Sequence, residues 1–103
     1  MKFSKKVYKI TKKIPIGRVC SYGEIARILN TKAYRAVGNA LRNNEHPEII
    51  PCFRVVKSNA EVGGYSGSDH KNIKKKIQKL KSEGVIIKNN KIVDFNKKFF
   101  RLS

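Results

Sequence analysis

The chain has 103 residues, and its 24 Lys and Arg residues outnumber its 7 Asp and Glu residues, which gives a formal net charge of +17 and a pI near 10.2. This length allows one small core and predicts a single domain over residues 1–103. No apolar run approaches the ~20 residues of a membrane span and no secretory signal is visible, so we expect a cytoplasmic protein, nucleoid-associated or, in a eukaryote, nuclear. The charge makes nucleic acid the first expected partner, and a lysine-rich surface that is merely solvated is the alternative.

Three helices are expected in the first half of the chain. Apolar residues recur at helical spacing until Pro15, which predicts a helix over about residues 4–13. Ser21 and Glu24 have the spacing of a capping box, in which the serine oxygen accepts the amide hydrogen of Glu24 and the carboxylate reaches back. This box opens a helix that runs to Asn30.

The next helix is expected over about residues 33–43. Its apolar face carries Ala36, Val37, Ala40 and Leu41, and its polar face carries Arg35, Asn39 and Arg42. Two short helices joined by a tight turn predict a helix-turn-helix over about residues 22–43, with an ordinary helical hairpin as an equal alternative.

The middle of the chain has an extended pattern. Residues 49–56 form a β-rich run interrupted by Pro51, a turn follows at 58–61, and a second short strand is expected near Val62. This pattern predicts a wing within the segment of about residues 49–67. Gly63, Gly64 and Gly67 allow the backbone there to approach a ligand closely.

A long basic helix is expected over about residues 69–83, capped by Ser68 or Asp69 and ended by Gly84. Its buried stripe is Ile73, Ile77 and Leu80, and the remaining face is expected to be solvated lysine: Lys71, Lys74, Lys75, Lys76, Lys79 and Lys81. Residues 84–103 then form a hairpin with an Asn-Asn turn and an aromatic tail. The fold class is therefore mainly α with small β elements, similar to a winged helix-turn-helix.

Cys52 is the main candidate for chemistry, because it lies in a short segment bounded by Pro51 and glycines in a chain with few other reactive groups. A disulfide with Cys20 is possible, but an intracellular setting favours free thiols. The two cysteines and two histidines lack the spacing of zinc ligands, so no metal and no cofactor are expected.

Seven segments together resemble a known family. In the family's order and nearly its spacing, they are similar to the C-terminal domain of O6-alkylguanine-DNA alkyltransferases, and the resemblance covers about residues 3–84. The segments are residues 14–19, 21–26, 35–40, 50–52, 54–56, 63–67 and 83–84. The family's usual N-terminal domain has no counterpart here, which implies a minimal form.

The resemblance implies a single-turnover DNA repair reaction. Members flip an alkylated guanine out of the duplex and move the alkyl group from O6 to a cysteine, here Cys52. Tyr22 matches the tyrosine that hydrogen-bonds the base, Arg35 the arginine that fills the vacated stack, and Asn44 the asparagine that ties the helix-turn-helix to the active-site segment. The second helix would lie in the minor groove, with contacts from Ala36, Gly38, Asn39 and Arg42. The implied partner is double-stranded DNA containing O6-alkylguanine, bound by a monomer.

The resemblance also implies a substrate pocket and a catalytic glutamate. The expected pocket residues are Tyr65, Ser66, Gly67, Pro51 and Val55, and Glu83 matches the glutamate that orients the family's catalytic histidine. That histidine follows the cysteine directly, but this chain has Phe53 there, which cannot accept a proton. His46 and His70 do not match its position. Either positive surroundings favour the thiolate or transfer is slow.

Two other functions stay open. The C-terminal segment also resembles alkyltransferase-like proteins, which bind alkylated DNA without transfer, although those proteins replace the active cysteine that this chain keeps. A winged-helix transcription factor without chemistry is the third possibility.

Overall fold

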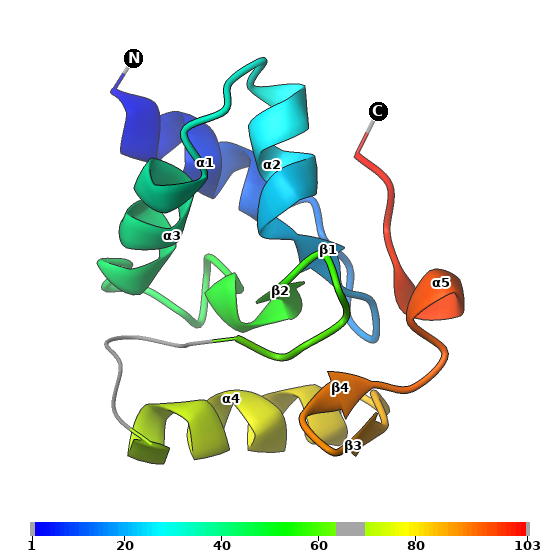
Figure 1. The fold of residues 1–103 in the computed structure, drawn as a ribbon. Helices are drawn as coiled ribbons and strands as arrows, with labels where there is room; N and C mark the ends of the chain where they lie inside the picture. Colours follow the sequence, from blue (N-terminus) through cyan, green and yellow to red (C-terminus); the bar gives the residue numbers. More distant parts are fainter. Residues whose placement is uncertain (1, 64–69, 103) are drawn as a thin grey trace.

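Two short parallel strands lie at the centre of the fold, between three helices on one side and a long helix on the other (Figure 1). The computed structural model describes residues 2–63 and 70–102. Strand β1 (Cys20–Ser21) pairs with β2 (Val55–Val56), and Cys20 lies opposite Val55. The residues of both strands are β-branched or small, and all are buried, as expected for parallel strands with packing on both faces.

The expected helices of the first half are present, each slightly shorter than predicted. They are α1 (Phe3–Thr11), α2 (Tyr22–Ile28) and α3 (Tyr34–Arg42). Asn30 adopts a left-handed backbone with φ of 54° just beyond α2, which ends that helix as asparagine readily does. The three helices pack around one apolar cluster that includes Val7, Ile10, Ile25, Val37 and Leu41.

Consecutive residues of the central segment point into different cores. Cys52 and Val55 belong to the cluster under α1–α3, whereas Phe53 and Val56 belong to a second cluster formed with α4 and the C-terminal hairpin. This alternation follows from a short 3₁₀ turn, η1 (Cys52–Arg54), that leads directly into β2. The segment therefore presents its cysteine toward the helices and its phenylalanine away from them.

The extended run predicted over residues 49–56 is only partly formed. Only Val55–Val56 of the 49–56 run is a strand, and it pairs with β1 and not with the residues near Val62. A tight turn returns the chain at Lys57, and Glu61 then bridges Lys91. Pro51 removes a ladder donor, so a continuous strand through it is not formed.

The last third of the chain contains α4 (His70–Ser82), β3 (Ile87–Lys88), β4 (Lys91–Ile92) and α5 (Phe95–Lys98). The hairpin turn is at Asn89 and Asn90, both with positive φ as predicted for this pair. The chain then passes beside β1, where Val19 bridges Phe99. The predicted caps Ser68 and Asp69 lie outside the described residues.

One part of the lysine prediction is wrong. Lys76 is not on a solvated face but fully buried, whereas Lys74 and Lys75 are exposed as expected. Lys76 follows Ile73 by three residues and precedes Leu80 by four, which places it on the same helical stripe as these apolar residues.

The capping box at α2 is half formed. The Ser21 hydroxyl accepts a hydrogen bond from the Glu24 amide at 3.0 Å, as predicted. The Glu24 carboxylate does not reach back to the cap, because it accepts hydrogen bonds from Arg27 and from the Leu102 amide at 2.9 Å. Within the described ranges, no helix combines the length and apolarity needed to cross a membrane.

Candidate active site

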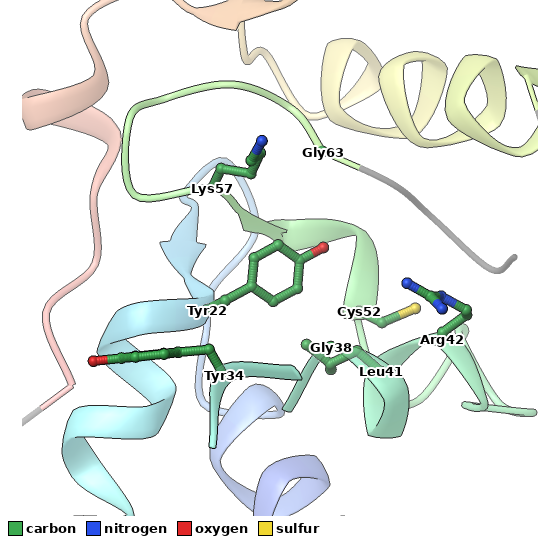
Figure 2. A pocket seen from close by; sticks show the side chains of 8 residues that line it. All are labelled: Tyr22, Tyr34, Gly38, Leu41, Arg42, Cys52, Lys57 and Gly63. Carbon is green, nitrogen blue, oxygen red and sulfur yellow. The ribbon is translucent and has the colours of Figure 1, made fainter. Parts of the chain in front are cut away.

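A cavity of about 320 Å³ opens between α2, α3 and the segment that carries Cys52, within the size range of ligand sites. Figure 2 shows the Cys52 thiol and the Tyr22 hydroxyl on the same side of it, with Arg42 beside the sulfur. The described lining residues are Tyr22, Tyr34, Gly38, Leu41, Arg42, Cys52, Lys57 and Gly63. Among them are two cations and no acid.

Backbone geometry fixes the position of the thiol. Pro51 has φ of −77° and ψ of 67°, and the Cys52 amide donates to the Ile50 carbonyl at 2.7 Å, which makes an inverse γ-turn just before the cysteine. The buried Asn44 amide donates to the same Ile50 carbonyl at 2.8 Å. Asn44 thus connects the end of α3 to the segment before the thiol, which is the contact expected for it.

Tyr22 lies at the start of α2, beside the thiol. The pKa of its hydroxyl is raised to about 12, mainly by burial and also by the neighbouring Cys52, while Arg42 opposes the shift. The phenol therefore stays protonated near neutral pH and is available as a hydrogen-bond donor. The Lys76 Nζ donates to the Tyr22 oxygen at 3.4 Å, and it lies 5.6 Å from the centre of the ring.

The expected DNA-contacting residues share one face of α3. Arg35, Ala36, Asn39 and Arg42 are exposed, and Gly38 has open space where a Cβ would stand. Ala36 was also expected on the apolar face, and that part is wrong, because only Val37, Ala40 and Leu41 are buried. Gly38, Leu41 and Arg42 also line the cavity, so the exposed face of α3 and the thiol belong to one continuous surface.

Phe53 and Glu83 lie away from the thiol. Arg54 binds the Glu83 carboxylate through three hydrogen bonds, the shortest of 2.6 Å, and donates to the Ile14 carbonyl at 2.9 Å. The Phe53 ring is buried, with the Arg54 guanidinium 5.1 Å and the Lys79 Nζ 5.2 Å from its centre. Glu83 therefore anchors an arginine and does not orient a histidine.

The structure separates the residues predicted for the substrate pocket. Pro51 lines a second hollow on the Phe53 side, together with Arg54 and Glu83. Val55 is fully buried beneath the site. Tyr65, Ser66 and Gly67 lie outside the described residues. His46 is exposed and pairs with Glu48 at 3.5 Å.

Sequence reasoning missed Lys57 and, above all, Lys76. The Lys76 Nζ donates to the Val55 carbonyl at 2.6 Å. The helical period of α4 places Lys76 on the apolar stripe, and this was the sequence signal for its burial.

The two cysteines differ in their surroundings. Both are free, so the disulfide alternative is not adopted. Cys20 is completely buried, and burial raises its pKa to about 12, as expected for an unreactive structural thiol. Across the described parts of the chain, no group of three or more His, Cys, Asp and Glu side chains is arranged to hold a metal ion.

The chain is similar in sequence to proteins of one known family. The family model of the 6-O-methylguanine DNA methyltransferase DNA-binding domain matches residues 2–85. The methylated-DNA–protein-cysteine methyltransferase of Methanocaldococcus jannaschii is 54% identical over 70 residues, which are 67% of this chain and 41% of that protein. The chain thus spans less than half the length of this curated relative.

Two solved structures extend the likeness to the fold. S. pombe Atl1, in complex with damaged DNA containing O6-carboxymethylguanine, matches with a TM-score of 0.83 and 26% identity over 97% of this chain and 95% of that chain. Mycobacterium tuberculosis OGT, in complex with DNA, matches with a TM-score of 0.72 and 37% identity over 81% of this chain and 50% of that chain.

Proposed function

The chain belongs to the 6-O-methylguanine DNA methyltransferase family through the DNA-binding domain of that family, and we propose that it repairs duplex DNA by transferring an alkyl group from O6 of guanine to Cys52. The observation that carries the proposal is the cavity that places the Cys52 thiol beside the Tyr22 hydroxyl and opens next to the exposed face of α3. A base flipped out of the duplex would enter this cavity.

Residues of the cavity and of the neighbouring exposed face of α3 have separate roles in this reaction. Cys52 attacks the alkyl carbon as a thiolate, since the thiol is a poor nucleophile. Tyr22 donates its proton to the leaving guanine, and Arg35 occupies the space that the base leaves in the stack. Gly38 and Ala36 allow α3 to lie close to the minor groove. The alkylated cysteine is not regenerated, so each molecule reacts once.

The remaining predicted residues support the site from outside the cavity. Asn44 holds the backbone before Cys52 through the Ile50 carbonyl. Asn39 and Arg42 contact the phosphates from the exposed face of α3. Tyr65, Ser66 and Gly67, which lie outside the described residues, are proposed for the alkyl pocket on the resemblance alone. The protein acts as a monomer, in the compartment that holds the DNA, and needs no cofactor.

The experiment weighs the intact protein after incubation with a duplex that contains a single O6-methylguanine. We expect the mass to rise by one methyl group, the modified peptide to contain Cys52, and the yield never to exceed one methyl per protein. Cys52→Ala with the same duplex, and the native protein with an unmethylated duplex, are the controls. A mass that stays unchanged while the methylated duplex is bound would refute transfer.

A second candidate is a damage sensor that binds alkylated DNA without reacting. The likeness to Atl1 in complex with damaged DNA covers 97% of this chain, which supports binding to damaged DNA but is common to both candidates. The same incubation separates the two, because a sensor prefers the methylated duplex but keeps its mass. A transcription factor would instead bind both duplexes equally and depend on their sequence.

A further inference from the structure

Tyr34 is an exposed aromatic residue beside the site, and none of the roles above uses it. Four large apolar side chains are exposed among the described residues, and they are Ile16, Tyr34, Ile49 and Ile86. Single exposed apolar residues are common and need no function. Tyr34 differs from the three isoleucines because it lines the cavity that contains the Cys52 thiol. An aromatic ring in such a place can stack on a base.

Local hydrogen bonds fix the backbone at Tyr34, where α3 begins. The Tyr34 amide donates to the Lys32 carbonyl at 2.9 Å, and Ala33 between them has φ of −80° and ψ of 61°, which is an inverse γ-turn. The Thr31 hydroxyl accepts a hydrogen bond from the Ala33 amide at 3.1 Å. The ring therefore extends from an ordered backbone, and its contact with a ligand needs little further ordering.

Tyr34 stands at one end of a row of cavity residues on α3. Gly38 and Arg42 follow at intervals of four residues, so the three lie on one face of the helix, and all three line the cavity. Among the described residues, nothing lies within 4 Å of the place where a Cβ of Gly38 would be. Figure 2 shows the Tyr34 hydroxyl directed away from the Cys52 sulfur. The ring is thus bordered by open space in which a flat base can lie.

Tyr34 also borders a second hollow, at the turn between α2 and α3. This hollow has a volume of about 320 Å³ and is lined by Gly23, Arg27, Asn30, Thr31, Lys32 and Tyr34. Tyr34 is the one described residue that lines both this hollow and the cavity of Cys52, so its ring is a ridge between them. Lys32 is exposed at the second hollow, and a cation there suits the phosphates of a DNA strand.

We propose that Tyr34 is a wedge in the damaged strand: its ring stands between the flipped guanine in the cavity and the next nucleotide of the same strand, which lies over the second hollow. Arg35 follows directly and points about 100° further around the helix, so the two side chains act at different places. Arg35 fills the vacated stack, whereas Tyr34 keeps the flipped nucleotide from returning. The wedge rests on the base flipping of the proposed function but not on alkyl transfer.

A wedge at this place would stabilise the opened DNA. Extrusion of a base costs the pairing and stacking that the duplex loses. Proteins that bind the minor groove often offset such a cost with an apolar side chain inserted between base steps. The ring of Tyr34 should therefore contribute most to binding where opening is costly and least where the base is already unpaired.

The test compares affinities for two duplexes by fluorescence anisotropy, with Cys52→Ala as the background so that no transfer occurs. One duplex has O6-methylguanine opposite cytosine, and the other has it opposite an abasic site, where opening costs less. Tyr34→Ala should weaken binding to the first duplex about tenfold, as for the loss of one aromatic stack, and binding to the second by less than about threefold. Tyr34→Phe keeps the ring and should match the background on both duplexes. Ile16→Ala removes an exposed apolar side chain that does not line the cavity and should also match it.

A fluorescent cytosine analogue opposite the O6-methylguanine reports the opening itself, because its emission rises when its partner leaves the stack. At saturating protein, this rise should be smaller in Tyr34→Ala than in the background and should be restored in Tyr34→Phe. Thermal melting verifies that each variant is folded, and Tyr34→Gln is a second variant without the ring. A merely structural role of Tyr34 would not produce this pattern.

Three outcomes would overturn the proposal. They are an unchanged affinity in Tyr34→Ala, equal losses on the two duplexes, and a loss in Tyr34→Phe as large as that in Tyr34→Ala, which would assign the contact to the hydroxyl. A native protein that takes no methyl group from DNA, with the variants as expected, would refute transfer and leave the wedge intact. Transfer by the native protein without any effect of Tyr34→Ala would do the reverse.

Discussion

Phe53 lies directly after Cys52, where the resemblance implies a histidine in the family, and its surroundings do not suit a base. The ring packs in an apolar cluster between the Arg54 guanidinium and the Lys79 ammonium. Two neighbouring cations disfavour a protonated imidazole. The Glu83 carboxylate, which would orient such an imidazole, is already bound by Arg54. The apolar cluster and the two neighbouring cations suit a phenylalanine ring and would make a histidine ineffective as a base.

Phe53→His is therefore expected to gain little activity. A productive general base would raise the rate by ~10²-fold or more, whereas we expect the single-turnover transfer rate to change by less than about threefold. Loss of the buried ring should lower the free energy of unfolding by about 1–3 kcal/mol, measured by urea denaturation. Phe53→Leu is the matched control, because it removes the ring without adding a base. A hundredfold gain in the histidine variant alone would show that the missing base limits transfer.

The prediction that Lys76 is solvated was wrong because it relied on the charge of the residue and not on its position in the helix. Its charge suggested solvent, but its spacing from Ile73 and Leu80 places it on the buried stripe. The buried contacts of its Nζ come from Val55 and Tyr22, which are 21 and 54 residues away in the chain. Periodicity could have predicted the burial, but no local pattern could have predicted those partners.

At the scale of elements, the Arg54–Glu83 pair joins three segments. It connects η1 to the end of α4, and it reaches the loop before β1 through the Ile14 carbonyl and the Gly17 amide. Both side chains are largely buried, with 13% and 12% exposure. Removal of one partner from such a pair leaves an uncompensated charge, which costs more than the pair itself contributes.

We expect Arg54→Met to lower the free energy of unfolding by about 3 kcal/mol, since it leaves the Glu83 charge unpaired. Glu83→Gln leaves the Arg54 charge without its counterion, but the amide oxygen can still accept a hydrogen bond from the guanidinium, so we expect a smaller loss. Urea denaturation measures both. Because Glu83 is bound away from the thiol, the pH profile of Cys52 alkylation should be unchanged in Glu83→Gln. A profile displaced in that variant would return Glu83 to a catalytic role.

Glu24 connects the C-terminal segment to α2. Its carboxylate binds Arg27 and the Leu102 amide, and the Arg27 guanidinium also donates to the Leu102 carbonyl at 2.7 Å. The hydrogen bond from Arg27 is the main cause that lowers the pKa of Glu24 below its ordinary value of 4.5. A depressed carboxyl pKa stabilises the fold above that ordinary value, and the contribution is lost as the pH falls through the folded-state pKa.

The melting temperature of Glu24→Gln should therefore lie below that of the native protein by a constant amount between pH 8 and about pH 5, and the difference should shrink below about pH 4.5 as the native carboxylate is protonated. Glu48→Gln, which alters an exposed carboxylate, is the control and should show little difference at any pH. A difference for Glu24→Gln that persists unchanged at pH 3 would mean that hydrogen bonding, and not charge, holds the segment.

Local signals predicted the elements better than their pairing. The Asn-Asn hairpin, the Ser21 cap and the three helices of the first half were each carried by residues close in sequence, and all are present. The β1–β2 pair joins residues 35 apart, and the C-terminal segment replaces the cap as the partner of Glu24. Strands of two residues have no periodic pattern, so nothing in the sequence indicated that β2 pairs with β1.

At the scale of the molecule, charge and shape act on the same surface. The net charge of +17 favours any polyanion, whereas the cavity lies beside the exposed face of α3, where Arg35 and Arg42 lie. The hairpin that carries Lys88 lies at the far end of α4 in Figure 1. Single replacements of lysines and arginines should therefore distinguish a general attraction to DNA from direct phosphate contacts along α3.

Binding to duplex DNA should weaken steeply with salt, with a slope of log K against log salt near −0.9 for each phosphate contacted. Arg42→Ala should reduce this slope by about one contact, while Lys88→Ala, exposed on the distant hairpin, should leave it nearly unchanged. Fluorescence anisotropy of a labelled duplex over a range of salt concentrations measures both. If DNA lies along α3, the two substitutions must differ, because only one removes a cation from that surface. Equal losses would mean that the charge acts as a diffuse attraction, and a slope near zero would exclude contact with the phosphate backbone.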